Sequence, residues 1–443
     1  MEQLIEQFVI YGGLAIICGI ILWVYFRSHK KSSKIVRKKV AQAKEEGLFE
    51  PVSLHPHIDL ETCIGSGACV KSCPEKDIIG LVDGAGTVIN TSQCVGHGAC
   101  FHACPVEAIT LRIGTETRGV ELPHVNENFE TNMAGIYIAG ELGGMGLIKN
   151  SVEQGKQAMQ NLIKAKKPNP NGVLDVVIIG AGPAGISAAL TAKEHGLDFK
   201  ILEQDSLGGT VFTFPRSKVV MTAPMELPLY GKVKLFNTSK DELLQLWRKV
   251  TSENDITIQE NTKVESIIPK EGDVFKVVTK EGEEIICNNV LLSIGRRGSP
   301  RKLNIPGENS PNVAYRLLEP ERIKNKKIMV VGGGDSAIES ALLLKDENKV
   351  ILSYRKDSFS RIKLANKAKI SEAIITGEIE VVFNSNLVSI AEKSVVLSVN
   401  NITTNVENDL VYIFAGGELP TKFLQKIGIL ITKRFDHIMK QHN

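Results

Sequence analysis

A short apolar run followed by a glycine-rich turn strongly limits what residues 174–185 can form. Val176–Ile179 is typical of a buried parallel strand, and the pattern G-x-G-x-x-G follows it directly and opens a helix. The first glycine permits a tight turn, the second lets the backbone approach a pyrophosphate, and the third lets helix and strand pack closely. Free N–H groups at the helix start favour that anion. The predicted phosphate-binding residues are Gly180, Gly182, Pro183, Ala184 and Gly185.

A second strand completes this unit. Phe199–Leu202 is apolar and ends in Glu203, about 20 residues after the glycines, where a carboxylate can bind a ribose diol. Strand, helix, second strand and acid together predict a dinucleotide site.

Length and composition restrict the class of protein. A chain of 443 residues can hold about three domains. Its apolar share of 43% and charged share of 23% are typical of a globular protein, and a net charge of +3 gives no reason to expect nucleic acid. Six of the eight cysteines lie between Cys63 and Cys104, which favours metal or cluster ligation over a disulfide framework.

The N-terminal region predicts a membrane anchor. Residues 8–26 are 19 residues without a charge, about 28 Å as a helix, close to the roughly 30 Å of a hydrocarbon core. A buried core helix is the alternative, but basic residues follow the run at once, from Arg27 to Lys39. This order is the reverse of a cleaved signal peptide, and it places the N-terminus outside and the remaining chain in the cytoplasm.

Two cysteine runs repeat the pattern C-x5-C-x3-C-P. The six cysteines are Cys63, Cys69 and Cys73 in the first copy, and Cys94, Cys100 and Cys104 in the second. This segment resembles the bacterial two-cluster ferredoxins, in which the last cysteine of each run ligates the other cluster. The usual second cysteine is replaced by Ser66 in one copy and by His97 in the other.

The resemblance implies two crossed ligand sets. Cys63, Cys69 and Cys104 would hold one cluster, with Ser66 at the fourth corner. Cys94, Cys100 and Cys73 would hold the other, with His97 at its corner. Three thiolates suit a [3Fe–4S] cluster, and a fourth ligand could complete a [4Fe–4S] one; imidazole is the better iron ligand of the two replacements. A zinc site is the alternative, but zinc ribbons do not explain a tandem repeat with terminal prolines.

Residues 131–141 resemble the closing FAD motif of thioredoxin reductases and related flavoproteins with two dinucleotide domains. Gly140 and Glu141 stand where that motif has Gly and Asp, and the resemblance implies that the acid binds the ribityl chain of the flavin. The helix after it would direct its N–H groups at the flavin ring. In the relatives this motif ends the chain, so the present chain is expected to be circularly permuted. Gly209 and Thr210 would also approach the flavin.

A second fingerprint follows the strand Ile328–Val331. It has the pattern G-x-G-x-x-A, and its predicted contacts are Gly332, Gly334, Asp335, Ser336 and Ala337. The next strand ends in Arg355 and Lys356, with Arg361 nearby, rather than in an acid. Basic groups accommodate the 2′-phosphate of NADPH, so NADPH is favoured over NADH.

These resemblances imply an α/β fold: two Rossmann-like three-layer domains for FAD and NAD(P), circularly permuted, preceded by a ferredoxin-like α+β iron–sulfur domain and one N-terminal transmembrane helix. The predicted boundaries are a transmembrane anchor at 8–26, a basic juxtamembrane segment and tether at 27–58, the iron–sulfur domain at 59–114, the closing segment at 115–166, the FAD domain at 173–305, the NAD(P) domain at 306–420 and a return segment to the FAD domain at 421–443.

The predicted function is transfer of electrons from NADPH through FAD to two iron–sulfur clusters, and on to a small-molecule or protein acceptor. No general acid, base or nucleophile is required. The small subunit of glutamate synthase is similar in arrangement. A thioredoxin reductase-like thiol reductase is one alternative, although the only cysteine after Cys104 is Cys287, on an apolar strand. A non-enzymatic membrane redox sensor is another. A homodimer is compatible with all of these.

Overall fold

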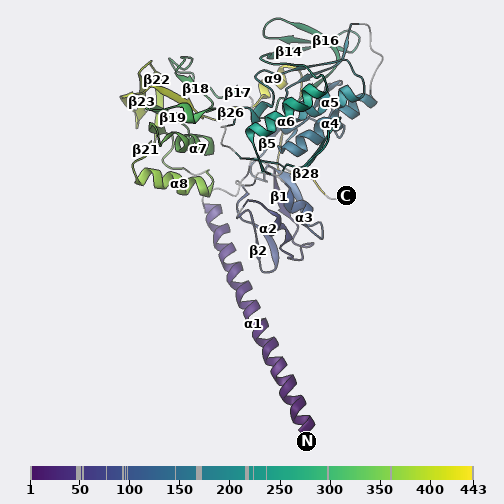
Figure 1. Cartoon of the computed structure of the whole chain (residues 1–443), viewed down its shortest axis with the longest axis vertical. Coiled ribbons are helices and arrows are strands. Elements are labelled where there is room, and N and C mark those ends of the chain that lie inside the picture. Colours follow the sequence, from purple (N-terminus) through teal and green to yellow (C-terminus); the bar gives the residue numbers. More distant parts are fainter. Residues whose placement is uncertain are drawn as a thin grey trace. The chain divides into compact units, whose positions relative to one another are not determined.

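Figure 1 shows the computed structural model of the whole chain, which folds into two compact units. The smaller unit comprises Met1–Val120 and Arg434–Asn443, and the larger unit is Glu121–Lys433. The residues described are 2–45, 51, 54–75, 77–91, 94, 96, 98–144, 146–165, 172–214, 219–222, 224–235, 237–296, 299–359 and 362–441.

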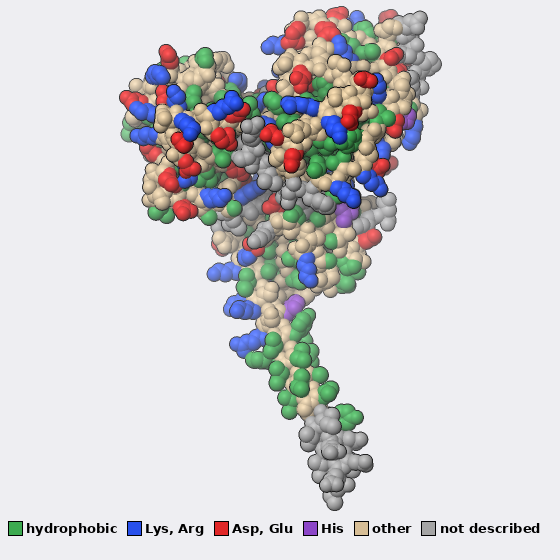
Figure 2. All heavy atoms as spheres, viewed as in Figure 1, with side chains coloured by type: hydrophobic (Ala, Val, Ile, Leu, Met, Phe, Trp, Pro, Cys, Tyr) green, Lys and Arg blue, Asp and Glu red, His purple; other side chains and the backbone are tan. Residues whose placement is uncertain are grey.

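The smaller unit begins with one unbroken helix, α1 (Glu2–Glu45). The apolar side chains from Tyr11 to Phe26 are mostly more than half exposed, and Figure 2 shows them as a green band that gives way to blue Lys and Arg. In the described part of the chain, α1 alone is long and apolar enough to cross a membrane. Its most apolar 18 residues have a mean hydropathy of 1.5, and none of them is buried.

The basic juxtamembrane segment and tether predicted at residues 27–58 has regular structure at both of its ends, which a tether would lack. The helix continues to Glu45, and Leu54–Ile58 forms strand β1. Residues 27–45 contain no Gly or Pro and many good helix formers, which explains the continuous helix. Ser33 and Ala43 are each 5% exposed, and the turn of α1 at Ser33 lies against the rest of the smaller unit, where the N–H of Asp83 donates to Ser33 Oγ.

Two β-structures and two short helices complete the smaller unit. Strand β1 pairs antiparallel with β4 (Ile109–Ile113), and β2 (Ile79–Val82) forms a hairpin with β3 (Ala85–Val88). Helices α2 (Ala68–Ser72) and α3 (Ala99–Ala103) each follow a glycine at positive φ and each end at a cysteine that precedes proline. The repeat seen in the sequence is therefore also a repeat of local structure.

Of residues 421–443, predicted to return to the FAD domain, only the first part packs into the larger unit. Helix α9 (Thr421–Lys426) packs into the larger unit through Leu424, and β27 (Ile431–Arg434) pairs with β5 (Val120–Pro123). Strand β28 (His437–Lys440) instead pairs antiparallel with β4 as the third strand of the smaller unit's sheet. An ion pair between Asp436 and Arg112 holds it there, an interaction that no local pattern encodes.

A seven-stranded sheet forms the core of the larger unit. Its order is β13 (Ile258–Gln259), β8 (Phe199–Leu202), β7 (Leu174–Ile179), β16 (Glu284–Leu292), β15 (Val274–Thr279) and β14 (Val264–Lys270), and β6 (Ile136–Ile138) pairs parallel with β16. Strand β6 precedes β7 in the chain but completes the same sheet. The helix after it, α4 (Ile148–Lys164), packs along α5 (Pro183–Glu194), which follows the first glycine-rich turn. The segment before the fingerprint thus closes the sheet, as the sequence predicts.

A second sheet lies in the C-terminal half of the larger unit. Its five parallel strands are β18 (Val313–Ala314), β25 (Leu410–Ile413), β19 (Lys327–Val331), β20 (Lys349–Ser353) and β21 (Ile379–Val382). Helices α7 (Asp335–Leu344) and α8 (Leu364–Ile375) follow β19 and β20, and a three-stranded antiparallel sheet joins β22 (Ser385–Ile390), β23 (Ser394–Val399) and β24 (Ile402–Glu407). Both halves are therefore α/β.

Smaller elements connect these parts. They are η2 (Glu141–Gly143), η3 (Gly209–Val211), β9 (Val219–Met221), β10 (Met225–Leu227), β11 (Gly231–Val233), β12 (Asn237–Ser239), α6 (Lys240–Glu253), β17 (Ser299–Pro300), η4 (Pro320–Arg322) and β26 (Gly417–Glu418). Strands β17 and β26 pair antiparallel where the chain enters and leaves the second half.

Glu308 organises the entry into the second half, and its removal should loosen that entry. Its buried carboxylate accepts the N–H groups of Leu303 (2.6 Å) and Asn304 (2.7 Å) and the hydroxyl of Tyr315. Burial alone would raise the pKa of Glu308, but these hydrogen bonds outweigh it and the pKa is lowered. A lowered pKa means that the carboxylate stabilises the fold above about pH 4.3 and loses this effect as the pH falls.

We expect Glu308→Gln to cost the local fold about 1–3 kcal/mol at pH 7, because one acceptor oxygen becomes a donor. Hydrogen–deuterium exchange of peptides that span residues 300–316 should accelerate, and the difference from the native chain should shrink towards pH 4. Glu321→Gln is the matched control, since Glu321 is exposed. Equal exchange in native and Glu308→Gln proteins at pH 7 would show that these hydrogen bonds do not hold the segment.

Candidate nucleotide and cluster sites

The first glycine-rich turn has a steric reason for each glycine. Gly180 has φ +106°, and a Cβ there would lie 2.6 Å from the carbonyl oxygen of Ser293. A Cβ on Gly185 would lie 1.9 Å from the carbonyl oxygen of Gly180. A Cβ on Gly182 would meet nothing within 4 Å, so the space next to this backbone is open to a ligand. Pro183 is the first residue of α5, whose N–H groups therefore begin at this turn.

Glu203 lies beside this turn at the end of β8. Its carboxylate accepts the N–H of Ala181 (2.8 Å) and the N–H of Asp205 (2.9 Å), and the residue is 5% exposed. Burial raises its pKa. Glu203, which is predicted to bind the ribose, therefore also orders the turn. Each of its carboxylate oxygens keeps a second lone pair that can accept a hydrogen bond from a ribose hydroxyl.

Two distant segments converge on the same turn. The N–H of Gly208 donates to the carbonyl oxygen of Ala181 (2.9 Å), and a Cβ on Gly209 would lie 3.4 Å from the Cα of Gly182. From the closing segment, Gly140 has φ +85°, and a Cβ there would lie 3.1 Å from the Cβ of Ala184. Thr210 lies in η3, directly after Gly209. The structure thus brings together three of the regions proposed to contact a flavin nucleotide.

Arg296 is a residue of this region that sequence reasoning missed. It is largely buried, which lowers its pKa, and the nearby Glu141 acts in the opposite direction. Glu141 opens η2, and its side chain packs against the Gly146 backbone. Arg296 follows the strand-end sequence Ser293–Gly295, so a basic residue directly after that glycine was the available signal.

The second glycine-rich turn differs from the first in what covers it. Gly332 has φ +141° and lies against the carbonyl oxygen of Phe414, whereas Gly334 has open space beside it. A Cβ on Gly333 would lie 2.2 Å from the ring of Tyr354, so this ring rests directly on the turn. Tyr354 also stacks on Phe359, with 5.5 Å between ring centroids. This aromatic cover was not predicted.

The remaining predicted residues of this half surround the start of α7. The carboxylate of Asp335 accepts the N–H of Lys363 (2.9 Å) and the side-chain amide of Asn366 (2.7 Å), so it ties α7 to α8. Ser336 follows it in the first turn of α7, and Ala337 is fully buried. Arg355 and Lys356 are exposed after β20, and Arg361 lies outside the described residues.

We expect the double variant Arg355→Ala/Lys356→Ala to raise the KM for NADPH about 10- to 100-fold and to leave the KM for NADH nearly unchanged. Charge-assisted hydrogen bonds to a 2′-phosphate are worth about 1.5–3 kcal/mol, and NADH has no such group. Steady-state kinetics with both cofactors measure this. Lys349→Ala, at the exposed opposite end of β20, is the matched control. Equal losses with NADPH and NADH would contradict a role in 2′-phosphate binding.

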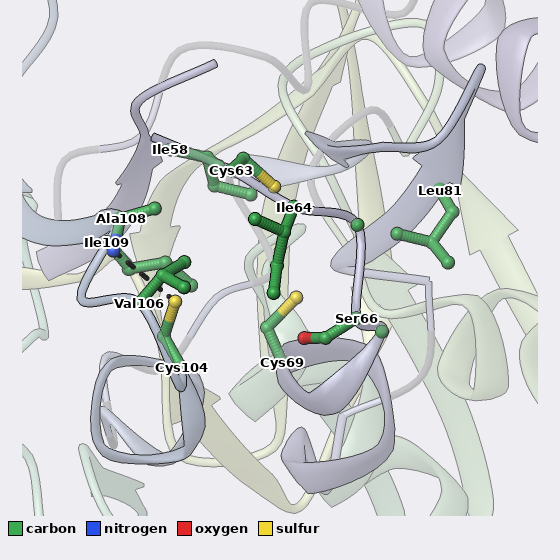
Figure 3. A pocket seen from close by; sticks show the side chains of 12 residues that line it. Ile58, Cys63, Ile64, Ser66, Cys69, Leu81, Cys104, Val106, Ala108 and Ile109 are labelled. Atoms are coloured by element: carbon green, nitrogen blue, oxygen red, sulfur yellow. Dashed lines mark hydrogen bonds between the residues drawn. The ribbon is translucent and has the colours of Figure 1, made fainter. Parts of the chain in front are cut away.

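Three cysteines and one serine surround a single cavity in the smaller unit. Cys63, Cys69, Cys104 and Ser66 line it together with apolar side chains (Figure 3). The N–H of Gly86 donates to Cys63 Sγ (3.3 Å), and the N–H of Ala108 donates to Cys104 Sγ (3.3 Å). Burial raises the pKa of Cys69, and the charges of Cys63 and Cys104 raise it further. This is the crossed set that the sequence predicts, with the last cysteine of the second repeat joined to the first two of the first repeat.

The other three cysteines lie near one another as well. Burial raises the pKa of Cys94 to about 11, with Cys73 contributing, and raises that of Cys100 to about 12, with Cys94 and Cys73 contributing. The N–H of Gly96 donates to Cys94 Sγ (3.4 Å). His97, the predicted fourth ligand, lies outside the described residues.

The donor sets suit a polynuclear cluster better than a single ion. Within the described ranges, no three His, Cys, Asp or Glu side chains converge closely enough to hold one metal ion. A zinc ion would draw its thiolates to about 2.3 Å from one point. The thiols of the first set instead line a cavity, and backbone N–H groups donate to two of the sulfurs; such hydrogen bonds help to set the potentials of iron–sulfur clusters.

Comparison with known proteins identifies both units. The model of the family "Pyridine nucleotide-disulphide oxidoreductase" matches residues 177–442, more than half of the chain. The chain belongs to this family. A "4Fe-4S dicluster domain" matches residues 55–105, which contain all six clustered cysteines. The chain thus joins a domain of this family to a segment that matches the dicluster ferredoxin domains.

Relatives of this family are ferredoxin–NADP reductases and thiol-linked reductases. The "Ferredoxin--NADP reductase" of Ignicoccus hospitalis is 30% identical over 42% of this chain and 57% of its own length. "Ferredoxin--NADP reductase 1" of Bacillus anthracis is 31% identical over 50% of this chain and 61% of its own length. The chain therefore spans about three fifths of the ferredoxin–NADP reductases it matches. "Bacilliredoxin reductase Bdr" of Bacillus subtilis is 25% identical over 58% of this chain and 81% of its own length.

A solved structure agrees on the fold of the larger unit. The "Bacillithiol Disulfide Reductase Bdr (YpdA) from Staphylococcus aureus" matches with a TM-score of 0.50 and 23% identity, over 59% of this chain and 84% of that chain.

The family's name refers to disulfides, but this chain offers little for disulfide chemistry. It has no C-x-x-C sequence, and Cys287 is its only cysteine after Cys104. Cys287 lies on β16 with no exposed surface, and burial raises its pKa to about 12. A thiolate is the reactive form, so this thiol is poorly placed to act as a nucleophile.

Proposed function

We propose that this protein is a membrane-anchored flavoprotein oxidoreductase that transfers electrons from NADPH through FAD to ferredoxin-type clusters and on to a further acceptor. The observation that carries the proposal is that one chain joins a nucleotide-binding sheet to a crossed set of three cysteines around one cavity. When bound, FAD accepts a hydride and releases single electrons, whereas iron–sulfur clusters carry one electron each, so the two belong in one circuit.

The protein's own residues bind and orient the cofactors. Gly182 and the start of α5 would receive the pyrophosphate of FAD, Glu203 its ribose, and Glu141 its ribityl chain. We infer that the order of β6 and α4 before β7 is a circular permutation of the arrangement in thioredoxin reductases and related flavoproteins. Arg296, next to Glu141, would place a positive charge near the flavin and stabilise its reduced, anionic form.

Two clusters, each with three thiolates, are proposed for the smaller unit. The Cys63, Cys69 and Cys104 set would hold one, and the Cys94, Cys100 and Cys73 set the other. Ser66 and His97 are the candidates for fourth ligands, and their use decides between [3Fe–4S] and [4Fe–4S] clusters. A ligand set with one thiolate fewer carries less negative charge, which favours reduction and hence flow from NADPH towards the clusters.

We propose that residues 8–26 of α1 cross the membrane, with the N-terminus outside and both units in the cytoplasm. The exposed apolar band and the basic residues that follow it support this orientation. Several relatives are named ferredoxin–NADP reductases, which favours a partner that exchanges one electron at a time with this protein.

A reductase for low-molecular-weight disulfides is the second candidate, since a bacilliredoxin reductase is among the relatives. The fully buried Cys287 argues against it, because the disulfide would need an accessible thiol or direct contact with the flavin.

An anaerobic titration with NADPH, followed by EPR and by FAD absorbance, tests the proposal. We expect FAD to bleach and cluster signals to appear or change with at most a few equivalents of NADPH. An oxidised [3Fe–4S] signal in the protein as purified would show that Ser66 and His97 leave a corner open. Bleached FAD with no cluster signal in any state would overturn the proposal and leave the disulfide reductase as the better candidate.

A further inference from the structure

The second half of helix α1 packs against other residues of the smaller unit. The N–H of Asp83 donates to Ser33 Oγ (3.2 Å), and Lys39 Nζ pairs with Asp77 at 2.6 Å. Arg37 also pairs with Asp83. A Cβ on Gly80 would lie 2.8 Å from a methyl group of Val36, so this part of β2 lies directly against the helix. These contacts fix the hairpin β2–β3 on the helix that enters the proposed membrane span.

The same hairpin also forms one wall of the first cysteine site. Leu81 lines the cavity of Cys63, Cys69 and Cys104, and the N–H of Gly86 donates to Cys63 Sγ. A Cβ on Gly65 would lie 1.8 Å from the carbonyl oxygen of Gly84, so the cysteine loop packs tightly on the hairpin turn. One hairpin therefore joins α1 to this cavity.

The position of the contacts along α1 sets their height above the lipid. Ser33 lies seven positions after Phe26, the end of the apolar run, which is about 10 Å of helix. Headgroups add about 5–8 Å on each side of a hydrocarbon core. A helix that crosses the bilayer with residues 8–26 would therefore hold the Asp83–Gly84 turn at the outer edge of the headgroups.

The exposed side chains in this part of the smaller unit suit contact with an anionic membrane surface. Lys30, Lys31, Lys34 and Lys38 are exposed on α1, and Figure 2 shows Lys and Arg projecting from the flank of these turns. Each basic residue near an anionic surface contributes about 1 kcal/mol of attraction. Ile64 lines the cysteine cavity and is 65% exposed, which makes the mouth of the cavity apolar.

We propose that α1 seats the smaller unit on an anionic bilayer surface, and that the acceptor is a lipid-soluble quinone that reaches the protein there. This inference rests on the proposed membrane anchor and NADPH oxidation. The overall reaction balances as NADPH, one solvent proton and quinone giving NADP⁺ and quinol: two electrons and one proton come from the hydride.

Fluorescence quenching in vesicles tests the seat without any turnover. The full-length protein, with a genetically encoded fluorescent amino acid at one site, is reconstituted in phosphatidylcholine–phosphatidylglycerol vesicles that carry a nitroxide on the headgroup or on the acyl chain. We expect acyl-chain quenching of a label replacing Ile17 and headgroup quenching of a label replacing Gly84, each measured against the same protein in vesicles without a nitroxide. A Cβ on Gly84, which has φ +83°, would meet nothing within 4 Å. Iron content verifies that the Gly84 variant keeps its clusters.

The outcomes separate the seat from the anchor. No acyl-chain quenching at Ile17 would overturn the anchor and with it this inference. Quenching at Ile17 without headgroup quenching at Gly84 would overturn the seat alone and leave the proposed function standing.

A seven-residue helical insertion after Lys31 tests the acceptor class. Seven residues lift the smaller unit about 10 Å and turn its face by only about 20°. We expect headgroup quenching at Gly84 to disappear and NADPH-driven reduction of a long-chain quinone in the vesicle to drop at least tenfold. Reduction of a water-soluble quinone analogue should not change. If the insertion abolishes the quenching but leaves the rate with the long-chain quinone unchanged, the quinone assignment is wrong. It is also wrong if the native protein reduces neither quinone, even where EPR supports electron transfer to the clusters.

Discussion

Replacing Cys104 by alanine is expected to remove the cluster shared with Cys63 and Cys69 and to leave the other cluster in place. Cys104 belongs to the second repeat in the sequence, yet its side chain lines the same cavity as the first two cysteines of the first repeat. A cluster deprived of one of three thiolates retains only two strong ligands, so about half of the iron should be lost. Iron analysis and EPR of the purified full-length protein measure this.

Alanine variants of the other cysteines show whether the two ligand sets are crossed. Cys73→Ala should yield the spectrum of a Cys94→Ala protein, whereas Cys104→Ala should yield the spectrum of a Cys63→Ala protein. Cys287→Ala is the matched control, because Cys287 lies on β16 in the core of the larger unit and belongs to neither repeat, so its replacement should not change the iron content. If Cys104→Ala and Cys94→Ala proteins share one residual spectrum, each repeat holds its own cluster and the crossed arrangement is wrong.

Gly155→Ala is expected to be severely destabilising although alanine is the better helix former. A Cβ on Gly155, in α4, would lie 2.1 Å from the backbone carbonyl oxygen of Ala184, in the first turn of α5. A backbone atom at this distance can yield only if the two helices separate. Overpacking of this kind costs about 3 kcal/mol, against a gain of about 1 kcal/mol in helix propensity.

The effect should extend to FAD binding. The N–H of Gly140 donates to the side chain of Gln154 (2.9 Å), one residue before Gly155, so a shift of α4 displaces the closing segment as well. We expect loss of most bound FAD and a fall in Tm of several degrees, measured by FAD content and thermal unfolding of the holoprotein. Gly19→Ala is the matched control, since a Cβ on this helical glycine meets nothing within 4 Å. Full FAD content and an unchanged Tm in Gly155→Ala would show that α4 is not needed to close the site.

Local patterns alone were enough to predict many of the elements. A β-branched run, a glycine turn and a helix are encoded within about 15 neighbouring residues, so β7 and α5 and their counterparts β19 and α7 could be placed from sequence. The crossed cysteine sets could be anticipated because their spacing resembles that of ferredoxins. The closing segment at β6 was recognised from a motif of about ten residues.

Other features depend on surfaces that meet only in the folded chain. Nothing near Asp436 predicts that β28 joins β4, because the partner residue Arg112 lies 324 positions away. The ring of Tyr354 on Gly333 and the burial of Arg296 beside Glu141 likewise arise where loops from different strands converge.

The sequence by itself determined the nucleotide turns, the cysteine repeats and the length of the apolar run, since each depends on residues close together in the chain. Only the tertiary structure decided that the part of α1 after the run packs on the β2–β3 hairpin through Ser33 and Val36. Basic residues at helical spacing are compatible with both a solvated tether and a docked helix. The choice depends on whether a complementary surface exists elsewhere in the chain, and here the hairpin next to Cys63 provides it.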